Sequence, residues 1–338
     1  MGSVTPQGVQ QGSQQQESPQ APTPSDARRL HYGEFYGLLP IDGDEPLAVV
    51  SGNCQAESLR IMLDGGGLRT VRVPPIFELE AADVPHLERL LSRTAVFVSQ
   101  PVRDGYHGLP IGTAELTALL PPGSQAVRMP VVRFAGLYPF HAIVRPPFDD
   151  SLVPPVVEYH DLRTVMQAWA ASGSPDARPS IPGGDPVTAD RVRAVADQSI
   201  AELQKREQHH DTVVVSDLFG EPAFDLMRTI NHPGNRVWSV AAERVRARLG
   251  LPEHDVDPGR PLLDTVHAPR EAVVLEAFGI DDAPTANWTV NGREVPAAEV
   301  ERAHLAWYAE HPSVVPAAIA RHRLALETLG LLPAGSAL

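Results

Sequence analysis

Residues 47–134 alternate between short apolar segments and longer amphipathic ones, and this alternation limits the fold more than any other feature of the chain. Short apolar runs are typical of buried strands, whereas apolar side chains repeated every three or four residues are typical of helices. The predicted strands are 47–52, 68–75, 94–101 and 125–134, and the predicted helices are 54–64, 81–93 and 112–121. Strands that alternate with helices form parallel sheets with right-handed crossovers. We therefore predict an α/β fold with a small parallel sheet flanked by helices.

The second half of the chain is mostly helical in its pattern. Helices are predicted over 160–173 and 187–208, from the turn at 231–233 to about residue 249, and once or twice between 298 and 332. A loop rich in Pro and Gly is predicted over 173–186. Residues 1–29 are rich in Gln, Ser and Pro and are predicted to be a disordered tail. We expect an α/β domain over residues 30–260 and a helical C-terminal extension over 261–338 that packs on it.

Charge and composition exclude several classes of function. The net charge of −14 disfavours a nucleic-acid binder, because such proteins need a cationic surface. No window holds 18 uninterrupted apolar residues, and the N-terminus lacks the apolar segment of a signal peptide. The only lysine is Lys205, so the chain has no phosphate-binding P-loop, and no G-x-G-x-x-G segment marks a dinucleotide site. A single cysteine forms no internal disulfide, which fits a reducing cytoplasm.

The one cysteine, Cys54, lies at the turn between the first predicted strand and the helix that follows it. A lone cysteine usually packs in the interior. At a helix start, however, unpaired N–H groups and the helix dipole favour a thiolate and lower the pKa of the thiol. The same N–H groups can stabilise an oxyanion when the sulfur attacks a carbonyl. Gly52 permits a tight turn, and Asn53 is a preferred N-cap whose amide could also donate to the oxyanion.

A nucleophilic cysteine needs a base, and the chain has 13 histidines. His232 is the best placed, since Pro233 suits the first position of a helix and a ring beside a helix start stays neutral. Asn231 could orient this ring, although the Asn-His-Pro segment could equally be a simple capping turn. His107, in a Gly- and Pro-rich loop after the third predicted strand, is the alternative base.

The loop after the third predicted strand carries further polar side chains. Gln100 ends this strand, so it would share the carboxyl edge of the sheet with Cys54. We predict that Gln100 donates to an oxyanion and that Arg103 binds an anionic group, with Tyr106 nearby. The alternative is an ordinary polar surface loop.

Three segments resemble, in order, the WcbI-type polysaccharide-biosynthesis family: VVSGNCQAESL, FVSQPVRDGYHGLPIGTAEL and VVVSDLFGEPAFDLMRTINHPGNRVW. The resemblance covers roughly residues 47–250, and a topology like that of the SGNH hydrolases would fit the strand order. It implies a coenzyme A-binding acyltransferase that acts on a sugar or a similar hydroxyl, with Cys54 as the reactive residue, His232 as its partner and Gln100 lining the site. The residues expected to bind substrate or coenzyme A are Gly52, Gln55, Arg103, Tyr106, His107 and Asn231.

The sequence thus predicts an acyltransferase that uses acyl-coenzyme A as co-substrate and a hydroxyl or amine of a sugar or natural product as acceptor. Cys54 would attack the acyl thioester and His232 would take and return the proton; in a variant without an acyl-enzyme, His232 would deprotonate the acceptor directly. A cysteine-dependent esterase or thioesterase and a non-catalytic ligand-binding protein are the alternatives. No metal is expected, because the adjacent His209 and His210 point differently on a helix. We expect a cytoplasmic protein and leave a homodimer open.

Overall fold

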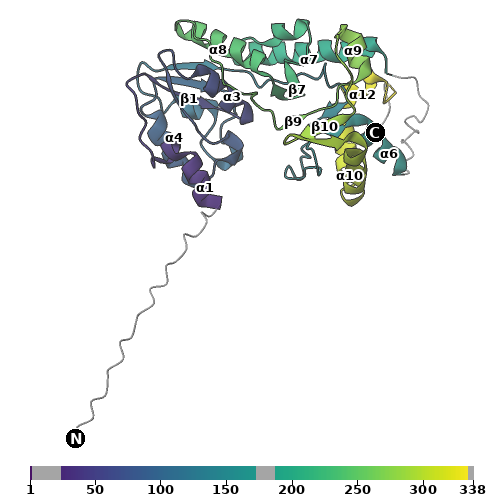
Figure 1. Cartoon of the computed structure of the whole chain (residues 1–338), viewed down its shortest axis with the longest axis horizontal. Coiled ribbons are helices and arrows are strands. Elements are labelled where there is room, and N and C mark those ends of the chain that lie inside the picture. The colour runs from purple at the N-terminus through teal and green to yellow at the C-terminus, as the bar shows by residue number, and fades with distance from the viewer. Residues whose placement is uncertain (2–23, 173–186, 334–338) are drawn as a thin grey trace.

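The computed structural model describes residue 1 and residues 24–172 and 187–333 (Figure 1). The loop predicted over 173–186 and most of the tail predicted over 1–29 lie outside these residues. The end of that tail differs from the prediction, because Pro24–His31 form helix α1, which is followed by α2 (Gly33–Tyr36). Nη2 of Arg28 in α1 lies 2.9 Å from Oδ2 of Asp83, and this distant ion pair, which local composition does not reveal, anchors the helix.

A four-stranded parallel sheet forms the centre of the N-terminal part (Figure 1). Across the sheet the strands are β2 (Arg69–Val71), β1 (Leu47–Ser51), β3 (Val96–Ser99) and β4 (Gln125–Arg128). Every residue of β1 and β3 is buried, as continuous apolar strands in a parallel sheet require. The predicted α/β fold class is therefore confirmed. β4 is shorter than predicted and ends before Pro130, which has no N–H to donate to a neighbouring strand.

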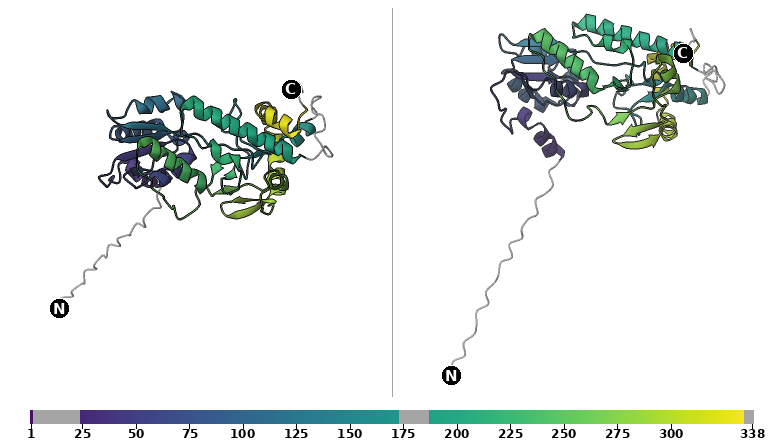
Figure 2. Two further views of the ribbon diagram at one scale, coloured as in Figure 1. Left: turned by 90° about the horizontal axis from the view of Figure 1, so that it is seen from above. Right: turned by 45° about the horizontal axis from the view of Figure 1, so that its top comes forward.

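Helices cover the sheet and connect its strands. They are α3 (Cys54–Leu63), α4 (Val84–Leu91) and α5 (Thr113–Thr117), with short 3₁₀ turns at Ile76–Glu78, Ala81–Asp83 and Tyr106–Gly108. Helix α8 (Asn235–Leu249) packs on α3 and beside β4. Figures 1 and 2 show α8 and the long helix α7 (Ala189–His210) along one side of the molecule, from the sheet to the C-terminal helices.

The rest of the second half builds a helical body around α6 (Leu162–Ala171) and α7. Helices α10 and α11 pack on α6, whereas α9 and α12 pack on α7. Their bounds are α9 (Ala272–Phe278), α10 (Ala297–Glu310), α11 (Val314–Arg321) and α12 (Arg323–Leu329). Among the described residues, no helix combines the length and the apolar character that crossing a membrane would need.

Short antiparallel sheets accompany these helices. They contain β5 (His141–Ala142) with β6 (His160–Asp161), β7 (Met227–Thr229) with β8 (His232–Pro233), and β9 (Val266–His267), β10 (Asn287–Val290) and β11 (Arg293–Pro296), and a 3₁₀ turn spans Ser216–Gly220. The β10–β11 hairpin was not predicted, since the extension was expected to be helical. Asn291 and Gly292 connect its strands and both have positive φ, the geometry of a two-residue hairpin turn.

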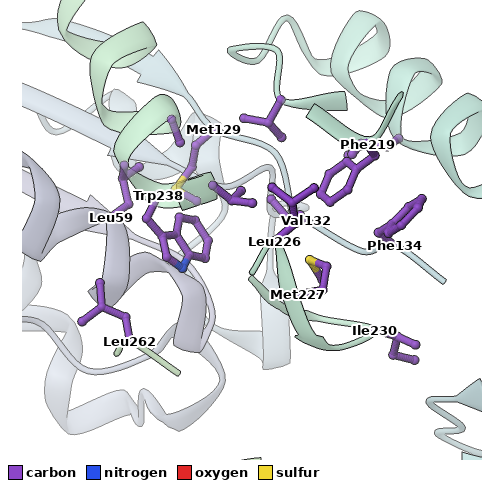
Figure 3. Close-up of a cluster of buried hydrophobic side chains, with 14 of the residues drawn as sticks. Leu59, Met129, Val132, Phe134, Phe219, Leu226, Met227, Ile230, Trp238 and Leu262 are labelled. Carbon is purple, nitrogen blue, oxygen red and sulfur yellow. The ribbon is translucent and has the colours of Figure 1, made fainter. Parts of the chain in front are cut away.

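One apolar core joins the sheet to the second half (Figure 3). Leu59 of α3 and Trp238 of α8 lie at one end of the cluster, and the stacked rings of Phe134 and Phe219 lie at the other, with their centroids 4.5 Å apart. Met227 of β7 lies between these groups. This packing fixes the β7–β8 hairpin, and with it His232, relative to the sheet.

Candidate active site

The turn after β1 places Cys54 at the carboxyl edge of the sheet, as the first residue of α3. Asn53 is the N-cap: its Oδ1 accepts a hydrogen bond from the N–H of Gln55 at 2.9 Å. A Cβ at Gly52 would lie 2.5 Å from Oε1 of Gln100, so a larger residue here would displace the amide that accepts from the N–H of Asn53. The predicted strand, tight turn and helix around Cys54 are confirmed.

Two fully buried glutamines connect this turn to distant parts of the chain. Oε1 of Gln100 accepts from the N–H of Asn53 at 2.8 Å, and Nε2 of Gln100 donates to Oε1 of Gln55 at 3.1 Å. The same Oε1 accepts from the N–H of Val132 at 3.0 Å. Nε2 of Gln55 donates to the carbonyls of Val132 and Asn231, each at 2.8 Å. The network therefore joins β3 and the start of α3 to the hairpin that carries His232.

This network changes the roles predicted for the two glutamines. Gln55 is 0 % exposed and Gln100 is 1 % exposed. Both amides already bond to protein groups, so neither faces a cavity as a ligand-binding side chain would. Gln100 is thus placed to position the Asn53 turn and not to donate to an oxyanion, and Gln55 is placed to position Asn231 and not to bind substrate.

His232 lies in β8 with its ring almost fully buried. Nε2 of His232 is 3.3 Å from Oη of Tyr159, and that hydroxyl also donates to Oδ1 of Asn231 at 2.8 Å. Nδ1 of His232 has no hydrogen-bond partner within the described part of the chain. Burial lowers the pKa of His232 below its usual value, although Glu158 acts in the opposite direction. The ring is therefore neutral at pH 7, as a general base requires.

The reason predicted for this neutrality is wrong. Pro233 does not open a helix: it pairs in β8, and α8 begins at Asn235 with Gly234 as N-cap. The carbonyl oxygen of Asp225 would lie 1.9 Å from a Cβ at position 234, so only glycine fits at this N-cap. Burial, and not a helix start, keeps the imidazole uncharged.

The protonation state of Cys54 also differs from the prediction. The backbone N–H groups of Cys54 and Gln55 do lower the pKa of the thiol, as expected at a helix start. Burial and the nearby carboxylate of Glu158 outweigh them and raise the pKa to about 11. The thiol is therefore protonated at pH 7. The prediction of a resting thiolate is wrong, because desolvation exceeds the effect of the helix dipole.

Two cavities adjoin Cys54 and share it, together with Glu57, as a lining residue. Cavity A, of about 200 Å³, lies between the start of α3 and the 72–75 segment; its other lining residues are Tyr32, Val50, Gly52, Asn53, Ala56, Arg72, Val73, Pro74 and Pro75. Cavity B, of about 540 Å³, lies between α3, the 260–265 segment and the β10–β11 turn; its other lining residues are Ser58, Ile61, Arg260, Pro261, Leu262, Leu263, Asp264, Thr265, Asn291 and Gly292. Cys54 thus borders two separate cavities.

The loop after β3 does not join this site. Arg103 and His107 are exposed, and Tyr106 packs beside His107 with ring centroids 4.3 Å apart. None of the three lines cavity A or cavity B. Oγ1 of Thr113 donates to the carbonyl of Gln100 at 2.9 Å, which directs the chain away from Cys54. His232 lines neither cavity either, but it is buried and its hairpin is tied to α3 through Asn231 and Gln55. This placement favours His232 over the exposed His107 as the base and does not support Arg103 and Tyr106 as ligand-binding residues.

Glu158 and Tyr159 belong to the site but were missed in the sequence. The carboxylate of Glu158 raises the pKa of both Cys54 and His232, so it lies near both groups, and it pairs with Arg145 at 2.5 Å. The segment VVEYH before α6 alternates in polarity like a short strand, which is the only signal that could have singled them out. No group of three or more His, Cys, Asp or Glu side chains in the described ranges could bind a metal ion.

The fold and the site define an α/β protein whose polar site lies at the carboxyl edge of a parallel sheet, where such sheets bind their ligands. The family described as polysaccharide biosynthesis enzyme WcbI matches residues 47–254, more than half of the chain. The chain belongs to this family and is an enzyme, as the resemblance of its three motifs predicted.

A solved structure described as WcbI, a novel polysaccharide biosynthesis enzyme, has the same fold. It superposes with a TM-score of 0.69 at 19 % identity, over 85 % of this chain and 99 % of that one. Its description specifies the native protein without a disulfide bond between coenzyme A and one of its cysteines. No curated protein matches the chain.

Proposed function

We propose that this enzyme transfers an acyl group from coenzyme A to a hydroxyl or amine of a saccharide or related acceptor, through Cys54 and His232. The observation that carries the proposal is that Cys54 lines both cavities. An acyl group on its sulfur could be loaded from one side and removed from the other. The family name supports a biosynthetic role. The mention of a coenzyme A–cysteine disulfide in the similar structure supports coenzyme A as donor, and Cys54 is the only cysteine that could lie beside it here.

In the proposed reaction the neutral ring of His232 accepts the thiol proton as the sulfur of Cys54 attacks the thioester carbonyl. The new acyl–sulfur bond forms as the bond to the coenzyme A sulfur breaks, and His232 returns the proton to the leaving thiol. The acceptor then loses its proton to His232 as it attacks the acylated Cys54, the acyl–sulfur bond breaks, and His232 passes the proton to the sulfur, which restores the free thiol. The raised pKa of Cys54 keeps the sulfur protonated, and so unreactive, until a donor is bound.

The first prediction concerns the covalent intermediate. Incubation with an acyl-coenzyme A should add the mass of one acyl group to the wild-type protein, and Cys54→Ala should show no adduct. Transfer by Cys54→Ala should fall by a factor on the order of 10³ or more, with thermal unfolding nearly unchanged. Cys54→Ser should retain little activity. Full activity of Cys54→Ala would exclude the covalent route and leave direct deprotonation of the acceptor by His232.

A second set of variants tests the base. His232→Gln should slow both adduct formation and transfer by roughly 10²–10⁴, because no other group takes the proton. His210→Gln, at the end of α7 and outside the hydrogen bonds that hold Asn231 and His232, is the matched control. Product analysis with and without a hydroxylated acceptor then separates transfer from hydrolysis: free acid alone, with no acylated acceptor, would identify a thioesterase instead.

A further inference from the structure

We propose that cavity A binds the acyl chain of the donor and that the enzyme prefers an apolar chain of about four to six carbons over acetyl. The inference rests on the proposed function and adds the substrate class to it. Its basis is the combination of three features of cavity A, which are an apolar lining, a limited volume and the position of Cys54 at its border.

The walls of cavity A are mainly hydrocarbon. Val50 comes from the end of β1, Ala56 from the first turn of α3, and Val73, Pro74 and Pro75 from the segment after β2. Ala56 and Val50 are buried in the main core, so these walls are rigid. Such a lining gains free energy from an apolar chain, because each buried methylene is removed from water.

The size of cavity A selects the length of that chain. Its volume is about 200 Å³. An apolar cavity of about 150 Å³ takes up benzene, a six-carbon molecule. An acetyl group has one methyl carbon beyond its carbonyl and would leave most of cavity A without contacts, which forfeits dispersion energy along the walls. A chain of about four to six carbons fills the volume without overpacking it.

The polar border of cavity A is already paired. Nε of Arg72 lies 3.1 Å from Oε1 of Glu57, and the guanidinium of Arg72 lies over the ring of Tyr32, 5.8 Å from its centroid. Glu57 is also paired with Arg60 at 2.7 Å. The charged groups at this border are therefore paired with one another. An uncharged acyl chain can enter cavity A without breaking an ion pair, whereas a chain that ends in a carboxylate would compete for Arg72. We therefore infer an uncharged chain.

The direct test measures kcat/KM for acetyl-, butyryl-, hexanoyl- and succinyl-coenzyme A with one acceptor. Each buried methylene should raise kcat/KM roughly fourfold, so the four extra methylenes of hexanoyl should raise it over acetyl by up to roughly 250-fold. Val73→Phe fills cavity A and should bring the hexanoyl-to-acetyl ratio close to one. Ile61→Phe changes cavity B instead and should keep the wild-type ratio. Transfer of acetyl at the same rate as hexanoyl, or a preference for succinyl, would overturn the inference while leaving the proposed function intact.

A second experiment tests whether cavity A binds an alkyl chain, and it does not depend on enzymatic activity. Methyl and hexyl methanethiosulfonate each form a mixed disulfide with Cys54, the sole cysteine, as sulfinate leaves and the thiol proton is lost to solvent. The hexyl adduct should unfold at a higher temperature than the methyl adduct, and Val73→Phe should remove the difference. Val73→Leu provides a milder filling if the phenylalanine variant does not fold. Equal unfolding temperatures of the two wild-type adducts would overturn the inference, whether or not the protein transfers acyl groups.

Discussion

Cys54 is subject to two opposing electrostatic effects of different range. The backbone N–H groups of Cys54 and Gln55, which are neighbours in the sequence, stabilise the thiolate and lower the pKa of the thiol. Burial and the carboxylate of Glu158, which depend on the tertiary fold, destabilise the thiolate and raise this pKa. The second pair prevails, and the thiol stays protonated. The pKa of His232 is lowered by burial, so its ring is neutral, and in the proposed reaction it accepts the proton of this thiol.

The contribution of Glu158 to this balance is testable. Glu158→Gln removes a negative charge near Cys54 and should lower the pKa of the thiol, because the thiolate is no longer repelled. The pKa of His232 should fall as well. Alkylation of Cys54 by iodoacetamide, followed as a function of pH, should show its midpoint at lower pH than in the wild type. Glu276→Gln, an exposed position on α9, serves as control, and a midpoint that stays in place or rises in Glu158→Gln would contradict the assignment.

At the residue scale, the sequence was sufficient to predict the turn and helix start at Cys54 but not the environments of Cys54 and His232. The turn signals around Gly52 and Asn53 are local, so they are readable in one chain. The pKa values are not local, since they depend on what buries each group. The glutamines show the same limit, because their hydrogen-bond partners lie far away in sequence, as Val132 does from Gln55.

At the scale of elements, the start of α3 and the β7–β8 hairpin form one unit because Gln55 bonds to both Val132 and Asn231. These bonds are buried, so a side chain that cannot replace them leaves several backbone groups without partners. The hairpin is also secured from the other side, where Nε1 of Trp238 donates to the carbonyl of Pro233 at 3.1 Å. The position of His232 relative to Cys54 therefore depends on few, identifiable contacts.

Replacing Gln55 should expose this dependence. Gln55→Leu should destabilise the protein by about 4 kcal/mol or more, because four partner groups lose a bond and each buried group left unsatisfied costs about 1–3 kcal/mol. It should also reduce kcat, since His232 loses its tie to α3. Gln198→Leu on α7, where Nε2 makes one partly buried bond to Thr328, should cost about 1 kcal/mol or less and leave kcat unchanged. Urea unfolding and initial rates measure both, and equal losses in the two variants would contradict a special role for Gln55.

Helices and strands were predicted correctly where their sequence pattern extends over many residues, and one hairpin was missed because its pattern is short. The alternation in residues 47–134 defined the sheet and its helices correctly. The β10–β11 hairpin was missed, although Asn291-Gly292 between alternating residues is a strong hairpin signal. That omission matters for the site, because the same two residues line cavity B.

At the scale of the whole molecule, the second half places several histidines in the interior. His141 stacks on Trp288 with centroids 4.7 Å apart, and its Nδ1 has no hydrogen-bond partner among the described residues. Nδ1 of His160 lies 2.6 Å from Oη of Tyr308, a residue of α10. These two histidines contact residues from the last part of the chain, and no pattern in a single sequence reveals such long-range contacts. Burial lowers the pKa of His141 to about 4 and that of His160 to about 3.

These shifts predict how stability depends on pH. Below about pH 6.5 the unfolded chain binds protons at His141 and His160 that the folded protein does not, so stability is lost as the pH falls from 6.5 towards 4. Each ring contributes a slope of up to about 1.4 kcal/mol per pH unit. His141→Phe keeps the stacking on Trp288 and removes the unpaired nitrogen, so urea unfolding should show a smaller slope by about that amount and no loss of stability at pH 7. The exposed His209→Phe should keep the wild-type slope, and an unchanged slope in His141→Phe would mean that His141 is protonated in the folded protein.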